Sequence, residues 1–394
     1  MPLIAMKPML DHAHANGYAV GAFDLVSLDF LEAILDAAER CRAPVVLSLA
    51  ESHFDYFDFE LAMPAVVAAA RRASVPVVIH LDHGASLASA ARAINLGCNG
   101  VMVDASHLSL AENIQVTGQV VEMARGCGVP VEGELGYVPG VEGEDAERHP
   151  GEIAYTSVDD ARRYVEETGV DFLAVSIGTV HGRMRGEPRL DFDRLAAIDE
   201  ALGIPLVIHG GTGLSDEQFA SLIERGVAKI NYYTALADAA GRQIEANVAA
   251  GERGYTSLVK GVRQAISEEV ELRIRQWGGA DRAGELLESC EPWSPVEHII
   301  LYNVDGLDEA GVEAMMAEGR QVLSAIPGVL AVDTGRAVME DADYRYCWRV
   351  RFCHPAVIDS YRDHPDHVAF ADRRFRPVAA NRISIDYQLL EGGQ

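Results

Sequence analysis

Nearly continuous apolar runs recur along the first 280 residues, each followed by a segment of helical character. The runs span 18–23, 44–50, 76–82, 100–103, 129–135, 170–177, 204–209 and 227–231. Strands that are apolar on both faces are typical of a parallel sheet covered by helices. Eight strand–helix units within about 250 residues predict a closed (β/α)₈ barrel, the TIM barrel. An open doubly wound sheet is the alternative, but it would have fewer strands and usually a Gly-rich first turn.

The pattern changes near the C-terminus, where strands no longer alternate regularly with helices. We expect strands at 298–304, 329–338, 346–352 and 383–389, and helices at 309–325 and 355–363. This order predicts a small α+β domain with an antiparallel sheet. Pro292 and Pro295 lie in a segment typical of a linker. The expected organisation is therefore a barrel at 1–284, a linker at 285–297 and an α+β domain at 298–394.

The charge and the cysteines limit the partners that we expect. The formal net charge is −27, which argues against nucleic acid or an anionic membrane as a partner. The six cysteines contain no CxxC pair and are typical of reduced thiols. The first ten residues carry neither a long apolar run nor a small-residue cleavage site. We expect a cytoplasmic protein that acts on small molecules.

Polar side chains follow the predicted strands, and three of them are histidines that each precede a glycine. They are His83, His181 and His209. The carboxyl ends of barrel strands meet at one mouth, so we expect these side chains to converge. Three imidazoles with an open fourth position are typical of a catalytic zinc site. A hydrogen-bonded core histidine is the ordinary alternative for any one of them, but three at strand ends favour a metal.

Two further features of the strand ends suggest what the metal would act on. Asp82 precedes His83 and is a candidate general acid or base. The glycine-rich turn 209–213 precedes a helix and is typical of a phosphate site, with a tight turn that needs positive φ as the alternative. Together they indicate carbon-acid chemistry on a phosphorylated ketone. A zinc ion would polarise the ketone and stabilise the enediolate, while Asp82 would move the hydroxyl proton.

These stretches together resemble the class II (zinc-dependent) fructose/tagatose-bisphosphate aldolase family over about residues 1–280. The stretches that carry the resemblance are Tyr18–Phe23, His80–His83, Val101–His107, Glu132–Gly136, Ile177–Gly182, His209–Gly213 and Ala228–Asn231. The resemblance implies reversible aldol cleavage of a ketose phosphate into dihydroxyacetone phosphate and an aldehyde. It implies Asp82 as the proton donor and the three histidines as ligands of a catalytic Zn²⁺, with a monovalent cation as a second candidate cofactor.

The resemblance also implies roles for other residues. Asp104 and Glu134 match acidic positions associated with a second or displaced metal, and support of the histidines is the alternative. Glu142, in the long loop 136–155, would be the base for the carbon-bound proton, and a solvated charged loop is the alternative. The implied substrate-binding residues are Asp24, Gly182, Gly210, Gly211, Thr212, Asn231, Tyr233 and Thr234.

Three positions depart from the pattern of that family, and the mildest is Thr212, which stands where the family usually has Ser. Asp24 stands where the family usually has Asn, and Tyr233 stands where it usually has Asp in an Asn-x-Asp-Thr stretch. Tyrosine is bulkier and uncharged, and the change lies in the region that orients the ketose. We therefore expect a phosphorylated ketone to be retained, with an aldehyde other than that of fructose or tagatose bisphosphate.

Residues 298–390 resemble the stress-responsive dimeric α/β barrel (Dabb) family. The matching stretches are His298–Tyr302, Ile326–Val329, Tyr361–His367 and Ile385–Tyr387. The resemblance implies a ferredoxin-like fold that pairs its sheets, so we expect a homo-oligomer, either a dimer or a tetramer. A domain that only drives oligomerisation and one with chemistry of its own are both open.

Two rival functions remain open for the barrel. A Schiff-base aldolase could use Lys229, one of only three lysines in the chain, although this leaves the three histidines unexplained. A non-catalytic scaffold could bind a sugar phosphate while the C-terminal domain senses or assembles. The presence of both Asp82 and the three histidines argues against such a scaffold.

Overall fold

The computed structural model describes residues 2–140, 153–183 and 188–389. The chain divides into two compact units. The larger is drawn from residues 1–87, 100–121 and 130–292, and the smaller from 88–99, 122–129 and 293–394.

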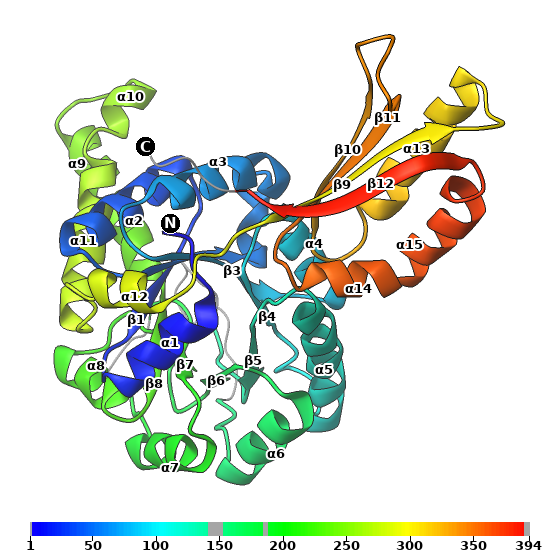
Figure 1. Ribbon diagram of the computed structural model, residues 1–394. Coiled ribbons are helices and arrows are strands. Elements are labelled where there is room, and N and C mark those ends of the chain that lie inside the picture. Colours follow the sequence, from blue (N-terminus) through cyan, green and yellow to red (C-terminus); the bar gives the residue numbers. More distant parts are fainter. Residues whose placement is uncertain (1, 141–152, 184–187, 390–394) are drawn as a thin grey trace. The chain divides into compact units, whose positions relative to one another are not determined.

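Eight parallel strands form a closed barrel in chain order (Figure 1). They are β1 (Val20–Asp24), β2 (Val45–Ala50), β3 (Val77–Gly84), β4 (Gly100–Val103), β5 (Val131–Leu135), β6 (Phe172–Val175), β7 (Leu206–Ile208) and β8 (Val227–Tyr232). The barrel closes where β1 pairs with β8, in a register that sets Val20 opposite Lys229. The predicted (β/α)₈ barrel is confirmed, and an open sheet is excluded. Most strands are a few residues shorter than the apolar runs.

Helices follow the strands as expected. They are α1 (Met6–Ala15), α2 (Leu28–Cys41), η1 (Glu51–Asp55, a 3₁₀ turn), α3 (Phe59–Arg72), α4 (Leu87–Leu96), α5 (Leu110–Gly126), α6 (Val158–Thr168), α7 (Phe192–Leu202), α8 (Asp216–Ile223), α9 (Thr234–Ala249), α10 (Tyr255–Leu258), α11 (Val262–Gln276) and α12 (Ala283–Ser289). Short polar side chains begin several of them: the Ser27 hydroxyl accepts from the Phe30 amide, and Ser215 and Gln218 form a capping box. Helix α12 covers the start of the predicted linker.

One end of the barrel is filled by a buried apolar cluster. Met6, Met9 and Leu10 of α1 pack there against the first residues of several strands, among them Val20 and Val78. Apolar packing at the amino-terminal ends of the strands leaves the carboxyl-terminal ends for polar side chains.

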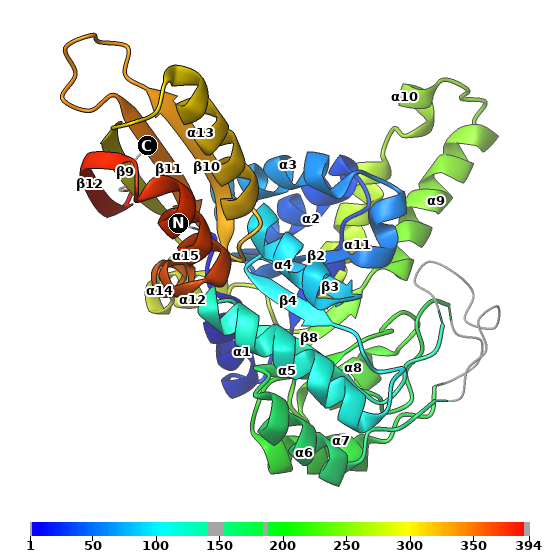
Figure 2. The same cartoon turned by 90° about the vertical axis from the view of Figure 1, so that its right-hand side faces the viewer.

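The smaller unit contains an antiparallel four-stranded sheet in the order β10-β11-β9-β12. Its C-terminal elements are β9 (Val296–Val304), α13 (Glu309–Leu323), β10 (Val329–Arg336), β11 (Tyr346–Phe352), α14 (Val357–Asp363), α15 (Pro365–Phe370), η3 (Ala371–Phe375, a π-helical turn) and β12 (Ala379–Gln388). Figure 2 shows the helices on one side of this sheet. The antiparallel α+β domain is confirmed, while α15 and η3 are additions that the sequence pattern did not indicate.

The two faces of this sheet differ in exposure. Trp348 and Tyr302 are buried on the helix-covered face, where their rings contact Phe370 and Phe375. Alternate residues point to the other face, and several are apolar and exposed; they are Leu301, Ile383, Ile385 and Tyr387. Among the described helices of the whole chain, none combines the length and the apolarity needed to cross a membrane.

Candidate active site

The end of β3 has an irregular backbone where the two candidate residues Asp82 and His83 lie. The register between β3 and β4 shifts between Leu81 and Gly84. His83 has a φ of +46°, in the left-handed region that β-carbon-bearing residues rarely adopt. A local bulge of this kind re-aims side chains, and such strain concentrates at functional sites. Here it allows the His83 ring to contact the ends of β7 and β4.

The three predicted histidines converge. The ring centroids of His83 lie 4.7 Å from His209 and 5.1 Å from His181, and one nitrogen of each residue lies within 4.8 Å of the others. His83 Nε2 contacts His209 Nδ1 at 3.0 Å. His181 Nδ1 lies 3.1 Å from the Val138 carbonyl oxygen, so this nitrogen donates, whereas the buried Nε2 has no hydrogen-bond partner among the described residues. Burial, with the charges of the other two histidines, lowers the pKa of His181 to about 3.

Four carboxylates surround the histidines. Asp104 Oδ2 contacts His83 Nδ1 at 2.9 Å, and Glu132 Oε1 contacts His209 Nε2 at 3.0 Å. Glu134 lies 3.6 Å from His209 Nδ1, and burial together with Asp104 raises its pKa to about 7. The fourth is Asp82. Burying so much negative charge is costly unless cations compensate it.

This set of residues fits a metal ion. Neutral imidazole nitrogens are the usual nitrogen ligands of Zn²⁺, and His181 offers a buried nitrogen that has no hydrogen-bond partner in the described part of the chain. Asp104 orients the His83 ring through its other nitrogen, which is the usual arrangement around a metal-bound histidine. Two further groups could also hold a cation: His83 with Asp104 and Glu134, and Asp82 with Glu132 and His209.

A buried chain of polar contacts fixes the Asp82 carboxylate. Asn231 Nδ2 donates to both of its oxygens at 3.0 Å, and Lys229 Nζ donates to Asn231 Oδ1 and to Glu132 Oε2, both at 2.7 Å. Burial opposes ionisation of Asp82, but the neighbouring charges of His83, His209 and Lys229 outweigh it and hold its pKa well below the usual range. Asp82 is therefore ionised and held in a single orientation at neutral pH.

His80, which shares β3 with Asp82, has a different position. It is fully buried beside Glu132 at 3.8 Å, and neither ring nitrogen has a hydrogen-bond partner among the described residues. Burial and the Lys229 charge lower its pKa to about 3, so it packs as a neutral ring.

The predicted phosphate turn lies between β7 and α8, and its glycines Gly210 and Gly213 adopt the positive φ that favours glycine. Gly210 has a φ of +72°, and a β-carbon there would lie 2.1 Å from the Val180 carbonyl oxygen. Gly182 also has a positive φ, of +81°. On the neighbouring strand end, Thr234 begins the sixteen-residue helix α9 and is fully buried. A glycine turn that precedes a helix and the first turn of a helix are places where backbone N–H groups commonly bind phosphate.

Aromatic side chains gather around Asp24 at the ends of β1 and β2. The His53 ring lies 4.5 Å from the Tyr233 ring, and its Nδ1 lies 3.8 Å from Asp24 Oδ2. Phe30 contacts Tyr233 from α2, with ring centroids 6.1 Å apart. His53 was not among the residues that the sequence pattern indicated. The signal was present, because the polar residues 51–53 follow the second apolar run just as other site residues follow theirs.

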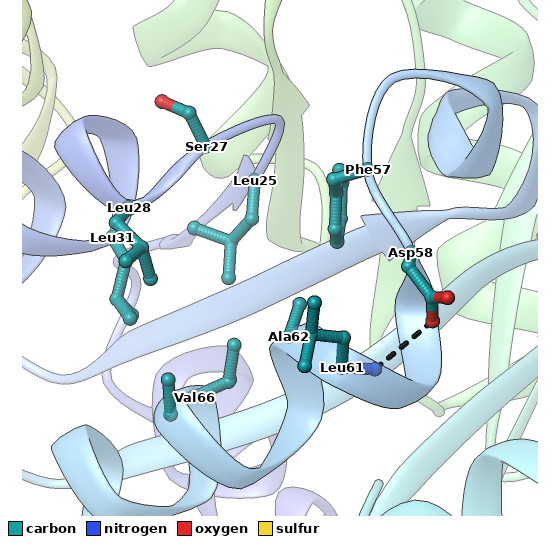
Figure 3. Close-up of a pocket in the computed structure, with 10 residues that line it drawn as sticks. Leu25, Ser27, Leu28, Leu31, Phe57, Asp58, Leu61, Ala62 and Val66 are labelled. Atoms are coloured by element: carbon teal, nitrogen blue, oxygen red, sulfur yellow. Dashed lines mark hydrogen bonds between the residues drawn. The ribbon is translucent and has the colours of Figure 1, made fainter.

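Next to this region an apolar cavity of about 210 Å³ lies between α2 and α3 (Figure 3). Leu25, Leu28 and Leu31 line one side, and Phe57 and Leu61 line the other. The Asp58 carboxylate in its wall accepts from the Leu61 amide and so caps α3. The cavity holds no charged group other than Asp58 and adds no candidate for catalysis.

The structure thus brings together the predicted metal residues, places Gly210 against Val180 and Gly211 near Asn231, and sets both Asp24 and Tyr233 against His53. Glu142 lies outside the described residues. Lys229 was predicted only as the nucleophile of the alternative Schiff-base mechanism, and Glu132 was given no role. In the structure Lys229 contacts Asn231 and Glu132, and Glu132 contacts His209.

Fold and site together define a (β/α)₈-barrel enzyme with convergent histidines at the carboxyl ends of its strands. Residues 4–282 match the family model described as "Fructose-bisphosphate aldolase class-II", and residues 296–389 match "Stress Responsive A/B Barrel Domain". The chain belongs to the class II fructose-bisphosphate aldolase family and carries a C-terminal Dabb domain. Both predicted resemblances are confirmed.

Individual proteins that are similar to this chain have names that agree with this family. A "Probable fructose-bisphosphate aldolase" of Bacillus subtilis is 39% identical over 288 residues, which cover 72% of this chain and all of the relative. The crystal structure of the YdjI aldolase from Escherichia coli K12 is 33% identical, with a TM-score of 0.65, and covers 71% of this chain and 99% of that one. The structure of a putative fructose-1,6-bisphosphate aldolase from Coccidioides immitis is 31% identical, with a TM-score of 0.66. The match covers 71% of this chain and 98% of that one.

Proposed function

We propose that this protein catalyses the reversible aldol cleavage of a ketose phosphate into dihydroxyacetone phosphate and an aldehyde. The observation that carries the proposal is the ionised Asp82 carboxylate fixed by Asn231 beside three converging histidines. The names of the relatives support the class of reaction. That the substrate of this chain is a ketose phosphate is likewise proposed.

His83, His181 and His209 would hold a catalytic Zn²⁺. When bound, this ion would supply Lewis-acid polarisation of the ketone oxygen. Asp104 would keep the His83 ring in the correct tautomer, and Glu134 would supply a further carboxylate for a displaced or second cation. A monovalent cation remains a prediction.

Asp82 would transfer the proton on the oxygen side of the broken bond. In the cleavage direction its carboxylate takes the proton of the hydroxyl that becomes the aldehyde oxygen, and in the condensation direction it returns that proton. Asn231 holds both carboxylate oxygens, so the orientation of the base is set before the substrate binds. Glu142 would serve the carbon-bound proton of the ketone.

Backbone N–H groups of the turn at Gly210 and Gly211, with Gly182, Thr212 and the start of α9 at Thr234, would bind the phosphate. The aldehyde would lie toward Tyr233 and Asp24, where His53 and Phe30 add aromatic surface. A phosphate on that end of the substrate would be repelled by the negative charge of the Asp24 carboxylate. We therefore propose an aldehyde without a terminal phosphate.

The contacts of Lys229 argue against a Schiff-base mechanism. Its ammonium is fully buried and donates to both Glu132 and Asn231. A nucleophilic lysine has to present its amine to the carbonyl carbon of the substrate, whereas Nζ of Lys229 is held by the Glu132 carboxylate and the Asn231 amide oxygen.

A retro-aldol screen tests the proposal. Ketose 1-phosphates with unphosphorylated tails and the two common bisphosphates would be supplied with Zn²⁺, and release of dihydroxyacetone phosphate measured. We expect release from a 1-phosphate, faster than from either bisphosphate, and loss of activity with a chelator that zinc restores. Borohydride with substrate would leave a zinc enzyme active. Inactivation by borohydride together with resistance to the chelator would contradict the zinc mechanism and favour a Schiff base at Lys229.

We also propose that the chain forms a homodimer through the open face of its C-terminal sheet. Leu301 of β9 and Ile383, Ile385 and Tyr387 of β12 lie side by side on this face, and Ile383 pairs directly with Leu301. Contiguous exposed apolar surface on a sheet marks an interface. An antiparallel sheet can cover such a face with its own copy in a two-fold arrangement.

A further inference from the structure

His53 lies beside the proposed base, in a position to which the proposed proton transfer gives no role. It belongs to η1, three residues after Ala50, the last residue of β2. Ala50 pairs with Asp82 across the ladder between β2 and β3. Asp24 ends the neighbouring strand β1, and Tyr233 directly follows β8, which pairs with β1 on its other side. Four adjoining strands therefore bring His53, Asp24 and Tyr233 to the part of the barrel mouth that Asp82 faces.

The His53 side chain is buried with one ring nitrogen unsatisfied. It is only 4% exposed, and its Nδ1 has no hydrogen-bond partner among the described residues. The ring packs on Tyr233, with centroids 4.5 Å apart, and Nδ1 lies 3.8 Å from Asp24 Oδ2, which is too far for a direct hydrogen bond. Buried polar atoms ordinarily have a partner, so this nitrogen indicates a ligand group that contacts it.

The chemistry of the two facing atoms favours a hydroxyl group as that ligand. An oxygen atom can lie about 2.8 Å from both His53 Nδ1 and Asp24 Oδ2, because these atoms are 3.8 Å apart. A hydroxyl can donate to the carboxylate and accept from the ring N–H at the same time. A carboxylate or a fully ionised phosphate only accepts, and the Asp24 charge would repel it. A metal ion is disfavoured, since no group of three candidate ligands in the described part of the chain includes His53.

The charge state of the His53 ring agrees with a hydroxyl partner. Burial lowers its pKa to about 4, although the nearby Asp82 charge acts in the opposite direction. The ring is therefore neutral at neutral pH and carries a single N–H, which either nitrogen can hold. A neutral ring offers directional hydrogen bonding to an uncharged group and little attraction to an anion.

We propose that His53 is a specificity-determining residue, which together with Asp24 binds a hydroxyl group on the aldehyde portion of the substrate. The inference rests on the proposed aldol reaction and narrows its substrate to a hydroxylated aldehyde without a terminal phosphate. Because the ends of β1 and β2 adjoin Asp82, the hydroxyl is carried by a carbon close to the aldehyde carbon. His53 contacts the substrate away from the bond that breaks, so it governs the choice of aldehyde and not the proton transfer.

Condensation kinetics with dihydroxyacetone phosphate and matched aldehydes test this. Propanal has no hydroxyl, whereas 2-hydroxypropanal and 3-hydroxypropanal carry one on the same carbon chain. With the zinc-loaded full chain, we expect kcat/KM for at least one hydroxylated aldehyde to exceed that for propanal about tenfold or more, the effect of a hydrogen bond to a buried partner. His53→Phe keeps a ring but removes Nδ1, so it should abolish this preference.

Two further variants separate hydrogen bonding from packing. His53→Asn places an amide nitrogen or oxygen where Nδ1 lies, and it should retain most of the preference. Tyr56→Phe is the matched control, because Tyr56 directly follows η1 and is exposed, so that removing its hydroxyl takes a polar atom from the same turn without touching the proposed contact. The preference should be unchanged in this control.

Three results would overturn the role of His53 and leave the aldol reaction standing, because dihydroxyacetone phosphate would still be consumed. The first is equal kcat/KM for propanal and both hydroxypropanals in the wild type. The second is a preference that persists in His53→Phe. The third is a loss of preference in His53→Asn or Tyr56→Phe as large as that in His53→Phe. No consumption of dihydroxyacetone phosphate with any aldehyde would instead contradict the proposed aldolase function, and this inference with it.

Discussion

Asp82 combines three properties that a proton-transferring residue needs: burial, a fixed orientation and an ionised state. Asn231 fixes the orientation of the carboxylate, and the positive charges of neighbouring side chains keep it ionised. Removing the charge while keeping the shape isolates the chemical role from the structural one.

We therefore expect Asp82→Asn to lower kcat by about 10² to 10⁴, the range typical of a lost general acid–base. Bound zinc should stay close to one ion per chain, because His83, His181 and His209 are intact. Steady-state kinetics with metal analysis measures both. Asp159→Asn is the control, since the Asp159 side chain is 96% exposed and should change neither value. Full turnover in Asp82→Asn would contradict the proposed mechanism.

His53 predicts part of the response to acid. Burial lowers its pKa to about 4, whereas a histidine in the unfolded chain titrates near 6.5. The folded protein then binds fewer protons than the unfolded chain between these values. The stability that His53 contributes is thus present above about pH 6.5 and is lost as the pH falls through about 4. A tenfold change in proton affinity corresponds to about 1.4 kcal/mol, so the loss reaches about 3 kcal/mol.

We expect His53→Gln to remove about this much of the acid-dependent fall in unfolding free energy. Urea unfolding of metal-free protein at pH 7, 5.5 and 4.5 measures the fall. The exposed His107 provides the control, and His107→Gln should follow the wild-type curve. A His53→Gln curve parallel to the wild type would show that His53 is not buried as a neutral ring.

A site residue can be predicted from the sequence when the residues next to it in the chain mark it. His83, His181 and His209 follow apolar runs and precede glycines, so each carries a signal in its own neighbourhood. The pairing of Lys229 with Glu132 carries none, because it depends on β8 and β5 facing each other across the barrel. Contacts of this kind arise only after the barrel has closed.

The turn after β7 shows how one element depends on a close approach of two backbones. A β-carbon on Gly210 would meet the Val180 carbonyl oxygen, whereas Gly213 has a similar positive φ and open space around it. An alanine at position 213 would therefore meet backbone strain alone, whereas an alanine at position 210 would meet both strain and a steric clash.

We expect Gly213→Ala to cost about 1–2 kcal/mol in unfolding free energy, the cost of a left-handed residue with a side chain. Gly210→Ala should cost more and should also weaken inhibition by dihydroxyacetone phosphate, because the phosphate turn must move. Urea unfolding and inhibition kinetics measure the two effects. Equal stability and equal inhibition in both variants would show that the turn tolerates displacement and does not hold the phosphate.

Strand bounds were predictable to within a few residues because buried parallel strands are apolar along their length. The bulge between Leu81 and Gly84 was not, because a register shift depends on the neighbouring strand. The same holds for the bulge between Ala380 and Ile383. The bulge at the end of β3 lies at the candidate active site, so the backbone feature that positions Asp82 and His83 was among the least predictable.

For the whole molecule, the open face of the C-terminal sheet predicts the state of assembly. We expect a dimer in sedimentation equilibrium, with twice the chain mass of 42.6 kDa. Ile383→Glu combined with Ile385→Glu should produce monomers, because two charges in a closed apolar interface are not compensated. Val338→Glu is the control, since Val338 is 99% exposed and does not lie on a strand of the sheet. Dimers that persist in the double variant would place the interface elsewhere.

The barrel and the α+β domain were both predictable at this scale, because strand–helix periodicity and its interruption extend over many residues. A homo-oligomer was also predicted, from the resemblance to the Dabb family. The face that would pair was not, because Leu301 and Ile383 become neighbours only when β9 pairs with β12.

The left-handed backbone of His83 has a consequence for evolution in the laboratory. Glycine would adopt a φ of +46° at this position without strain, so exchanging the histidine should make the metal-free protein more stable. A selection for heat tolerance alone would then favour variants that have lost a proposed metal ligand. Thermostable descendants of this enzyme have to be screened for turnover in every round, because at position 83 the two traits are in direct conflict.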